Sequence, residues 1–147
     1  MRIYETYRCY ETYHIYVISM PLEDLLVDKK DQIENFVEKA KDLVGIDNET
    51  GENVILVSRS GLSDRHLIGL HLIGKYFASE LQKVDSSTMS LKELAQVTGL
   101  SYHTVAARLS DLKREGLVRA PSRGDWEIIF PKIGVFLDEI RDKLNLQ

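Results

Sequence analysis

The chain has 147 residues, 44% of them apolar, and a formal net charge of −4. This length and composition suit one globular domain or two small ones, and they exclude a mainly disordered chain. No run of about 18 apolar residues and no signal-peptide pattern is found, so the sequence predicts no membrane span, no secretion and a cytoplasmic location.

The acidic charge is concentrated in the first part of the chain. Residues 1–87 carry 10 Lys and Arg against 15 Asp and Glu, whereas residues 88–147 carry 9 against 8. The net charge argues against a nucleic-acid partner at first sight, but its distribution matters more than its sum. A nucleic acid would meet the less acidic second part, with modest and salt-sensitive non-specific affinity. The single cysteine, Cys9, excludes an intrachain disulfide.

The first 20 residues are rich in Tyr, Thr, Ile and Val, which favour extended structure. Five of the seven tyrosines lie at positions 4, 7, 10, 13 and 16, so residues 3–20 are predicted to form one long strand or two. We favour packing and cross-strand contacts for these tyrosines. The alternative is stacking on unpaired bases, but a base-stacking surface usually needs a basic groove, and this stretch has only Arg2 and Arg8.

Residues 21–60 predict a small α/β element. Pro21 suits a first helical turn, and the apolar spacing favours a helix to about Gly45, which the charged residues 28–32 would interrupt. The apolar run 54–57 follows a turn-rich connector and is predicted to be a buried strand. The order strand, helix, strand over residues 1–60 is expected to serve dimerisation or ligand sensing.

Apolar residues at helical spacing predict a helix over residues 62–81. Within it, residues 69–76 come within one residue of a phosphate-binding loop. However, Tyr76 replaces the magnesium ligand, and the segment lies inside a helical pattern, so we interpret the match as a coincidence. The four histidines show no metal-site spacing, and neither a metal nor a cofactor is expected. They are His14, His66, His71 and His103.

Two helices joined by a short turn are predicted between Ser90 and Gly116. A capping box of Ser90 and Glu93 starts the first helix, and Gly99 suits the left-handed residue that ends it. Ser101 caps the second helix, which is expected to extend to about residue 115. The expected apolar faces are Leu91, Leu94, Ala95 and Val97 on the first helix, and Val105, Leu109 and Leu112 on the second.

A two-stranded hairpin is predicted to follow, with strands at 117–120 and 126–130 and a turn from Pro121 to Asp125. From Ser90 to Phe130 the chain resembles the DNA-binding domain of winged helix-turn-helix transcription regulators, the broad superfamily that includes MarR-like and ArsR-like repressors. Helix 62–81 resembles the helix that packs behind this motif. The matching positions are Leu94, Ala95, Gly99, Leu100, Ser101, Thr104, Val105, Leu109, Leu112, Gly116 and Leu117.

The resemblance implies an α+β fold, in which a winged helix-turn-helix follows the strand-helix-strand element and precedes a C-terminal helix. It divides the chain into residues 1–60, 61–132 and 133–147. It also implies a transcription regulator that binds double-stranded DNA, with helix 101–115 in the major groove and the wing, residues 117–130, beside it.

Individual residues have distinct expected roles at this interface. Tyr102 and His103 can form hydrogen bonds with bases or phosphates, while Ala106 and Ala107 allow close approach to thymine methyl groups. Arg123 at the wing tip is placed to enter a minor groove or touch the backbone. The candidate DNA-binding residues are Ser101, Tyr102, His103, Thr104, Ala106, Ala107, Arg108, Ser110 and Arg123.

Residues 133–146 predict a C-terminal helix with more apolar residues than one small wing needs to cover it. It resembles the dimerising helices of winged-helix regulators and implies a homodimer, with DNA half-sites about one helical turn apart. Because Ala106 and Ala107 offer no hydrogen bonds, a winged-helix protein-interaction or assembly module is the alternative. No nucleophile motif is present and no enzyme is expected. Whether a small-molecule effector binds stays open.

Overall fold

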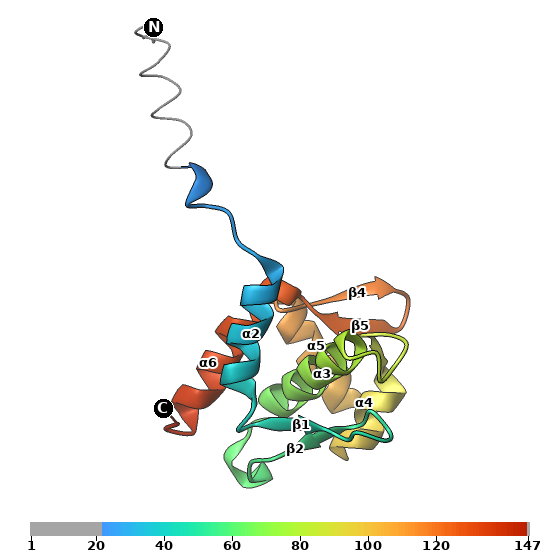
Figure 1. Cartoon of the computed structure of the whole chain (residues 1–147). Coiled ribbons are helices and arrows are strands. Elements are labelled where there is room, and N and C mark those ends of the chain that lie inside the picture. The colour runs from blue at the N-terminus through green and yellow to red at the C-terminus, as the bar shows by residue number, and fades with distance from the viewer. Residues whose placement is uncertain (1–21, 147) are drawn as a thin grey trace, which may run out of the picture. The chain divides into compact units, whose positions relative to one another are not determined.

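The computed structural model describes residues 22–146 (Figure 1). The chain separates into two compact units, residues 1–34 and residues 35–147. The helices are α2 (Lys29–Ala40), α3 (Asp64–Glu80), α4 (Leu91–Thr98), α5 (Tyr102–Arg114) and α6 (Ile133–Lys143). The strands are β1 (Val44–Ile46), β2 (Asn53–Ile55), β3 (Met89–Ser90), β4 (Val118–Ser122) and β5 (Asp125–Ile128). Two short 3-10 turns are η1 (Arg59–Gly61) and η2 (Phe130–Lys132).

The helix predicted over residues 21–45 is shorter than expected. Helix α2 begins at Lys29, inside the charged stretch that was expected to interrupt it. The reason is a cap, because Asp28 Oδ1 accepts a hydrogen bond from the Lys30 N–H at 3.0 Å. Residues 22–28 before this cap are exposed. The tyrosine-rich stretch 3–20, Cys9, His14 and Pro21 lie outside the described residues.

At its C-terminal end the predicted helix gives way to a strand. Val44 belongs to β1 and pairs with Ile55 of β2 in an antiparallel hairpin, so assigning Val44 to a helix was wrong. Pairing with Ile55, eleven residues further along, overrides the local helical spacing. The strand predicted at 54–57 is β2, shifted to Asn53–Ile55. The prediction that it is buried was wrong, because Val54 is 46% exposed. The described part of the N-terminal element is therefore a helix followed by a hairpin.

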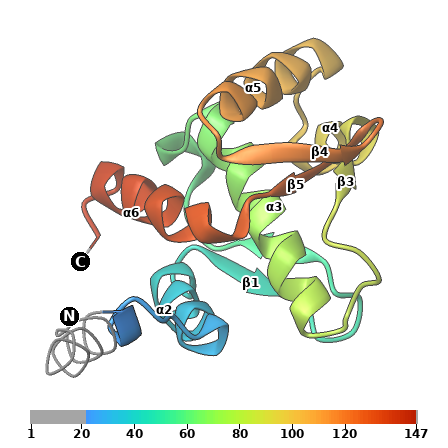
Figure 2. The ribbon, with the colours of Figure 1, turned by 90° about the horizontal axis from the view of Figure 1, so that it is seen from above.

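Helix α3 is the centre of residues 35–147, as Figure 2 shows, with α5 on one side of it and β1 on the other. Twelve of its 17 residues are buried, and Ser63 caps it by accepting a hydrogen bond from the His66 N–H. The helix predicted at 62–81 is thus confirmed. Residues 69–76 lie inside this continuous helix and form no phosphate-binding loop.

Helices α4 and α5 form the predicted helix-turn-helix. The capping box of Ser90 and Glu93 is present, and Gly99 ends α4 in the left-handed conformation at φ 74°. The predicted core residues of α5, Val105, Leu109 and Leu112, are all fully buried. The prediction was wrong for Val97, which is 50% exposed.

The wing is the β4–β5 hairpin, which β3 extends to a three-stranded sheet in the order β3-β5-β4. Its first strand is longer than predicted, because Ser122 pairs with Asp125 and leaves only Arg123 and Gly124 in the turn. Gly124 has φ 84°, a conformation that glycine adopts without strain. The predicted α+β winged helix-turn-helix fold is confirmed.

Helix α6 completes the core of this unit. Its apolar side chains Ile133, Phe136, Leu137 and Ile140 are fully buried. A Cβ added at Gly69 of α3 would lie 2.1 Å from the Phe136 ring, so the glycine makes room for this aromatic side chain. The apolar residues of residues 133–146 are therefore used mostly inside the chain itself, and Val135 stays exposed.

Candidate nucleic-acid interface

Helix α5 presents an exposed face opposite its buried one. We call this the reading face, and it consists of Tyr102, His103, Ala106, Ala107 and Ser110, all of which are exposed. The i, i+4 and i+7 spacing of the buried residues forces these positions outward. Within the described residues, the side chains of Tyr102, His103 and Ser110 form no hydrogen bond. The polar groups of this face are therefore available to a partner.

The N-terminus of α5 is capped by Ser101. Its hydroxyl oxygen accepts a hydrogen bond from the Thr104 N–H at 3.1 Å and donates one to Thr104 Oγ1 at 3.0 Å. The Ser101 hydroxyl is therefore occupied by the helix itself. The hydroxyl proton of Thr104 is still available to a phosphate. The helix dipole favours an anion at the same end.

Arg108 is half-buried and is paired within its own helix. Its Nε lies 3.0 Å from Asp111 Oδ2, and Arg114 also contacts the Asp111 carboxylate. One carboxylate therefore offsets part of the charge of two arginines on α5. A phosphate that approached Arg108 would compete with Asp111, which reduces the electrostatic gain.

The wing carries two exposed arginines in different settings. Arg123 occupies the turn and has no ion pair in the part of the chain that the structure describes. Arg119 on β4 lies 2.8 Å from Glu127 Oε1 on β5, directly opposite in the strand register. The sequence reasoning missed Arg119, although strand alternation signals it, because Val118 points into the core and its neighbour must point out.

Side chains from neighbouring elements hold α5 in place. At its C-terminal end Glu115 accepts a hydrogen bond from Arg65 Nε of α3 at 3.2 Å. Arg65 and His66 also hydrogen-bond Glu139 of α6, the histidine at 2.6 Å. Burial raises the pKa of Glu139, but the hydrogen bonds from Arg65 and His66 outweigh burial and hold that pKa below its ordinary value.

The turn of the helix-turn-helix is anchored from η1, because the Arg59 guanidinium donates a hydrogen bond to the Thr98 carbonyl. This bond satisfies one of the carbonyls that the end of α4 leaves unpaired. At the packing surface of α4 and α5, the side chain of Ala95 is small and buried. The scaffold beneath the reading face is therefore well determined.

Seven of the nine candidate residues are exposed, and Thr104 and Arg108 are half-buried. Strand β4 contacts α5, so the wing lies beside this helix (Figure 2).

None of the helices in residues 22–146 has the length and apolar character needed to cross a membrane. Over the same residues, no three His, Cys, Asp or Glu side chains are grouped so that they could hold a metal ion.

Comparison with known proteins agrees with the geometry. Residues 79–119 match the model of the winged helix-turn-helix DNA-binding family. The match covers the end of α3, both helices of the motif and the start of the wing. The description does not distinguish MarR-like from ArsR-like repressors. No significant match is found to a curated protein or to a solved structure. The chain therefore contains a winged helix-turn-helix DNA-binding domain.

Proposed function

From the winged helix-turn-helix DNA-binding domain in this chain, we propose that the protein is a transcription regulator that binds double-stranded DNA. Helix α5 would lie in the major groove and the wing would contact the neighbouring backbone or minor groove. The observation that carries the proposal is the reading face, a row of exposed side chains whose polar groups have no partner within the described chain. A cytoplasmic location is part of the same proposal.

The chemistry of the reading face favours close approach more than dense hydrogen bonding. Tyr102 and His103 would contact base edges or phosphates at the start of the helix. Ala106 and Ala107 would lie against the groove floor, where an alanine can contact a thymine methyl group. Thr104 and Arg123 would hold phosphates and set the register.

The electrostatic attraction to DNA is expected to be weak. Residues 90–132 carry 7 Lys and Arg against 5 Asp and Glu, and Asp111 and Glu127 already pair with three of the arginines. Few phosphates would therefore be neutralised, so the DNA affinity would decrease only modestly as the salt concentration rises.

A mobility-shift titration with a random duplex at two salt concentrations tests the proposal. The variant Arg123→Ala should weaken binding uniformly and reduce the salt slope by about one. Lys41→Ala is the matched control, because Lys41 is exposed and lies between α2 and β1 in the chain. Figure 2 shows these two elements on the opposite side of α3 from α5. If no duplex binds at either salt concentration, the regulator proposal fails.

The sparse reading face favours one alternative, a protein-interaction or assembly module without sequence-specific DNA binding. Selection of bound genomic fragments separates the two, because a regulator enriches a common sequence and a protein-binding module does not. We also propose a homodimer, through residues 1–60 or 133–147, with half-sites about one helical turn apart. Analytical ultracentrifugation tests it, and spaced half-sites among the selected fragments would support it.

A further inference from the structure

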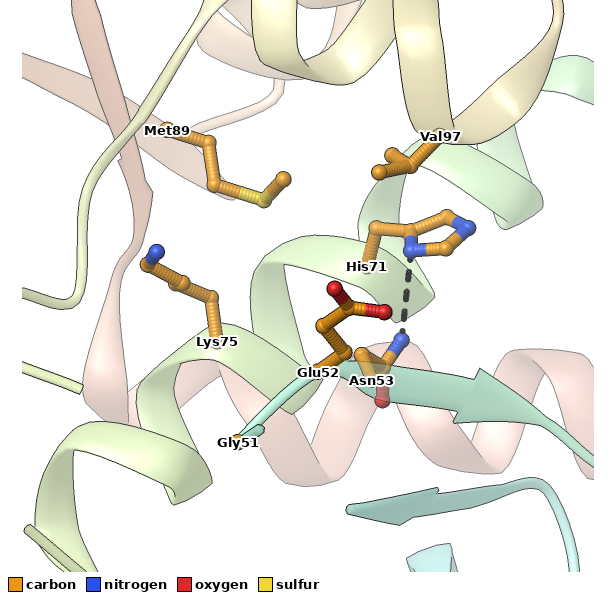
Figure 3. Close-up of a pocket in the computed structure, with 7 residues that line it drawn as sticks. All are labelled: Gly51, Glu52, Asn53, His71, Lys75, Met89 and Val97. Carbon is orange, nitrogen blue, oxygen red and sulfur yellow. Dashed lines mark hydrogen bonds between the residues drawn. The ribbon is translucent and has the colours of Figure 1, made fainter. Parts of the chain in front are cut away.

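A pocket of about 110 Å³ lies between the β1–β2 hairpin, α3, β3 and α4 (Figure 3). The hairpin contributes Glu52 and Asn53, and α3 contributes His71 and Lys75. The helix-turn-helix side of the pocket is apolar and consists of Met89 from β3 and Val97 from α4. This position explains why Val97 is half-exposed, although its place in the sequence predicts a core residue.

Two opposite charges enter this pocket without a strong partner. Glu52 forms no ion pair within residues 22–146. Lys75 Nζ is 3.9 Å from Glu93 Oε2, at the limit of an ion pair, and Glu93 already accepts a hydrogen bond from the Ser90 N–H. Figure 3 shows the side chains of Glu52 and Lys75 pointing toward the side where Met89 lies. The pocket thus offers one carboxylate and one ammonium beside an apolar wall.

The remaining polar groups add no net charge. His71 is buried, and its Nδ1 lies 3.3 Å from Asn53 Nδ2, which donates to it when the ring is neutral. Burial, assisted by the positive charge of Arg59, lowers the pKa of His71 to about 4. Among the residues that line the pocket, the charged side chains at neutral pH are therefore Glu52 and Lys75.

The hairpin side of the pocket is held in position before any ligand arrives. Asn53 packs so closely on α3 that a Cβ at Gly74 would lie 2.0 Å from its Oδ1, an atom that is buried without a hydrogen-bond partner. In the hairpin turn, Asp47 Oδ1 accepts hydrogen bonds from the N–H groups of Glu49 and Thr50, each at 2.8 Å. Such order lowers the entropy cost of binding.

We propose that this pocket binds a free α-amino acid with a small apolar side chain. Its carboxylate would pair with Lys75, its ammonium with Glu52, and its side chain would lie against Met89 and Val97. A zwitterion matches the opposite charges, whereas a singly charged ligand would leave one of them unpaired in a partly buried site. The volume suits a ligand as small as an amino acid.

Binding at this site would act on the DNA-binding elements, and this second step rests on the proposed function. Met89 belongs to β3, which pairs with β5 of the wing, and Val97 belongs to α4 of the helix-turn-helix. A ligand that contacts both Met89 and Val97 would favour one distance between β3 and α4. Affinities for amino acid and duplex would then change by the same factor, as linkage requires.

Isothermal titration calorimetry on the full chain tests the pocket without DNA. The probes are L-alanine, L-valine and L-leucine, with isobutylamine and isobutyrate as ligands that carry one charge each. We expect at least one amino acid to bind, and each single-charge probe to bind at least tenfold more weakly. No heat with all three amino acids, or equal affinity for the single-charge probes, would overturn the proposal.

Three variants locate the site. Glu52→Gln and Val97→Phe should each weaken amino-acid binding at least tenfold, the first by removing the ammonium partner and the second by filling the pocket. Both positions are exposed or half-exposed, and thermal melting checks that the fold persists. Glu49→Gln, an exposed carboxylate in the same turn, is the matched control and should bind as the wild type does. Unchanged binding by Glu52→Gln would place the ligand elsewhere and refute the assignment.

The mobility shift is then repeated with and without the amino acid that binds. A change of threefold or more in duplex affinity supports the coupling, and an unchanged affinity refutes the coupling while the pocket stands. If no duplex binds at all, the proposed function fails, and calorimetry still decides the pocket. The two failures are therefore distinguishable.

Discussion

Helices α5 and α6 are both amphipathic, but they use their polar residues differently. On α6, Asp138 pairs with Lys39, Glu139 with Arg65 and His66, and Arg141 with Asp42. These contacts tie α6 to α3 and to the end of α2. On the reading face of α5, by contrast, the polar side chains have no partner in the described residues.

This contrast indicates which helix is structural and which is available to a partner. Polar groups that satisfy one another inside a chain add to its stability and leave little for a partner to bind. Polar groups left on a rigid, exposed helix face add little to stability, and binding residues are often of this kind. The following variants test whether α6 is structural and α5 binds a partner.

The largest effect is expected from Phe136→Ala on α6. Phe136 is fully buried beside Gly69 and under the guanidinium of Arg65, whose Cζ lies 5.3 Å from the ring centroid. Loss of the ring should lower the free energy of unfolding by about 3–5 kcal/mol in urea denaturation. Val135→Ala, at the exposed neighbouring position, is the control and should cost less than about 1 kcal/mol. Equal losses at both positions would contradict a structural role for the buried face.

The same new charge on each helix tests the comparison directly. Ala107→Glu places a carboxylate on the reading face, where it would repel DNA phosphates, and we expect duplex affinity to fall at least tenfold, or about 1.4 kcal/mol. Val135→Glu places a carboxylate on α6 and should leave duplex affinity unchanged. Fluorescence anisotropy measures both, with melting curves as the check on folding. A loss of binding with Val135→Glu alone would reverse the assignment of the two helices.

A smaller effect is expected from Glu139→Gln, and it should depend on pH. The pKa of Glu139 is lowered in the folded protein from its ordinary value of 4.5. Its carboxylate therefore stabilises the fold fully at a pH above 4.5, and this contribution disappears as the pH falls through the lowered pKa. At pH 7 the variant should be less stable by about 1 kcal/mol. The difference from wild type should vanish in acid. Asp138→Asn, whose carboxylate forms an exposed pair, is the control and should cost less than about 0.5 kcal/mol.

The smallest effect is expected from Ser110→Ala on the reading face. Ser110 is exposed and has no side-chain hydrogen bond in the described chain, so unfolding should change by less than about 0.5 kcal/mol. Duplex affinity should fall by no more than about fivefold, the value of one hydrogen bond. A large loss of stability, measured by urea denaturation, would show that this face is structural after all.

Local sequence signals predicted much of this fold correctly. Ser90 with Glu93, Gly99 and Ser101 mark the ends of α4 and α5, because caps and left-handed turns depend on residues only a few positions apart. Periodic apolar residues likewise predicted α3 and the buried face of α5. The reading face follows from the same period, since whatever does not point inward must point outward.

The main errors involve contacts between parts of the chain that are not neighbours in sequence. Val44 has helical spacing but pairs with Ile55, and Val97 has core spacing but lies beside a pocket that the hairpin helps to form. The apolar residues of α6 suggested a partner surface, whereas most of them are buried in the core of their own chain, and the homodimer stays a prediction.

The sequence by itself therefore determined the winged helix-turn-helix and the residues that helix α5 exposes, because caps and periodicity act over one or two turns of chain. Only the tertiary structure decided which charges are already paired, that α6 is mostly buried, and that Glu52, Lys75, Met89 and Val97 meet around one pocket. These outcomes depend on which distant side chains come within a few ångströms of one another. Sequence spacing does not contain that information.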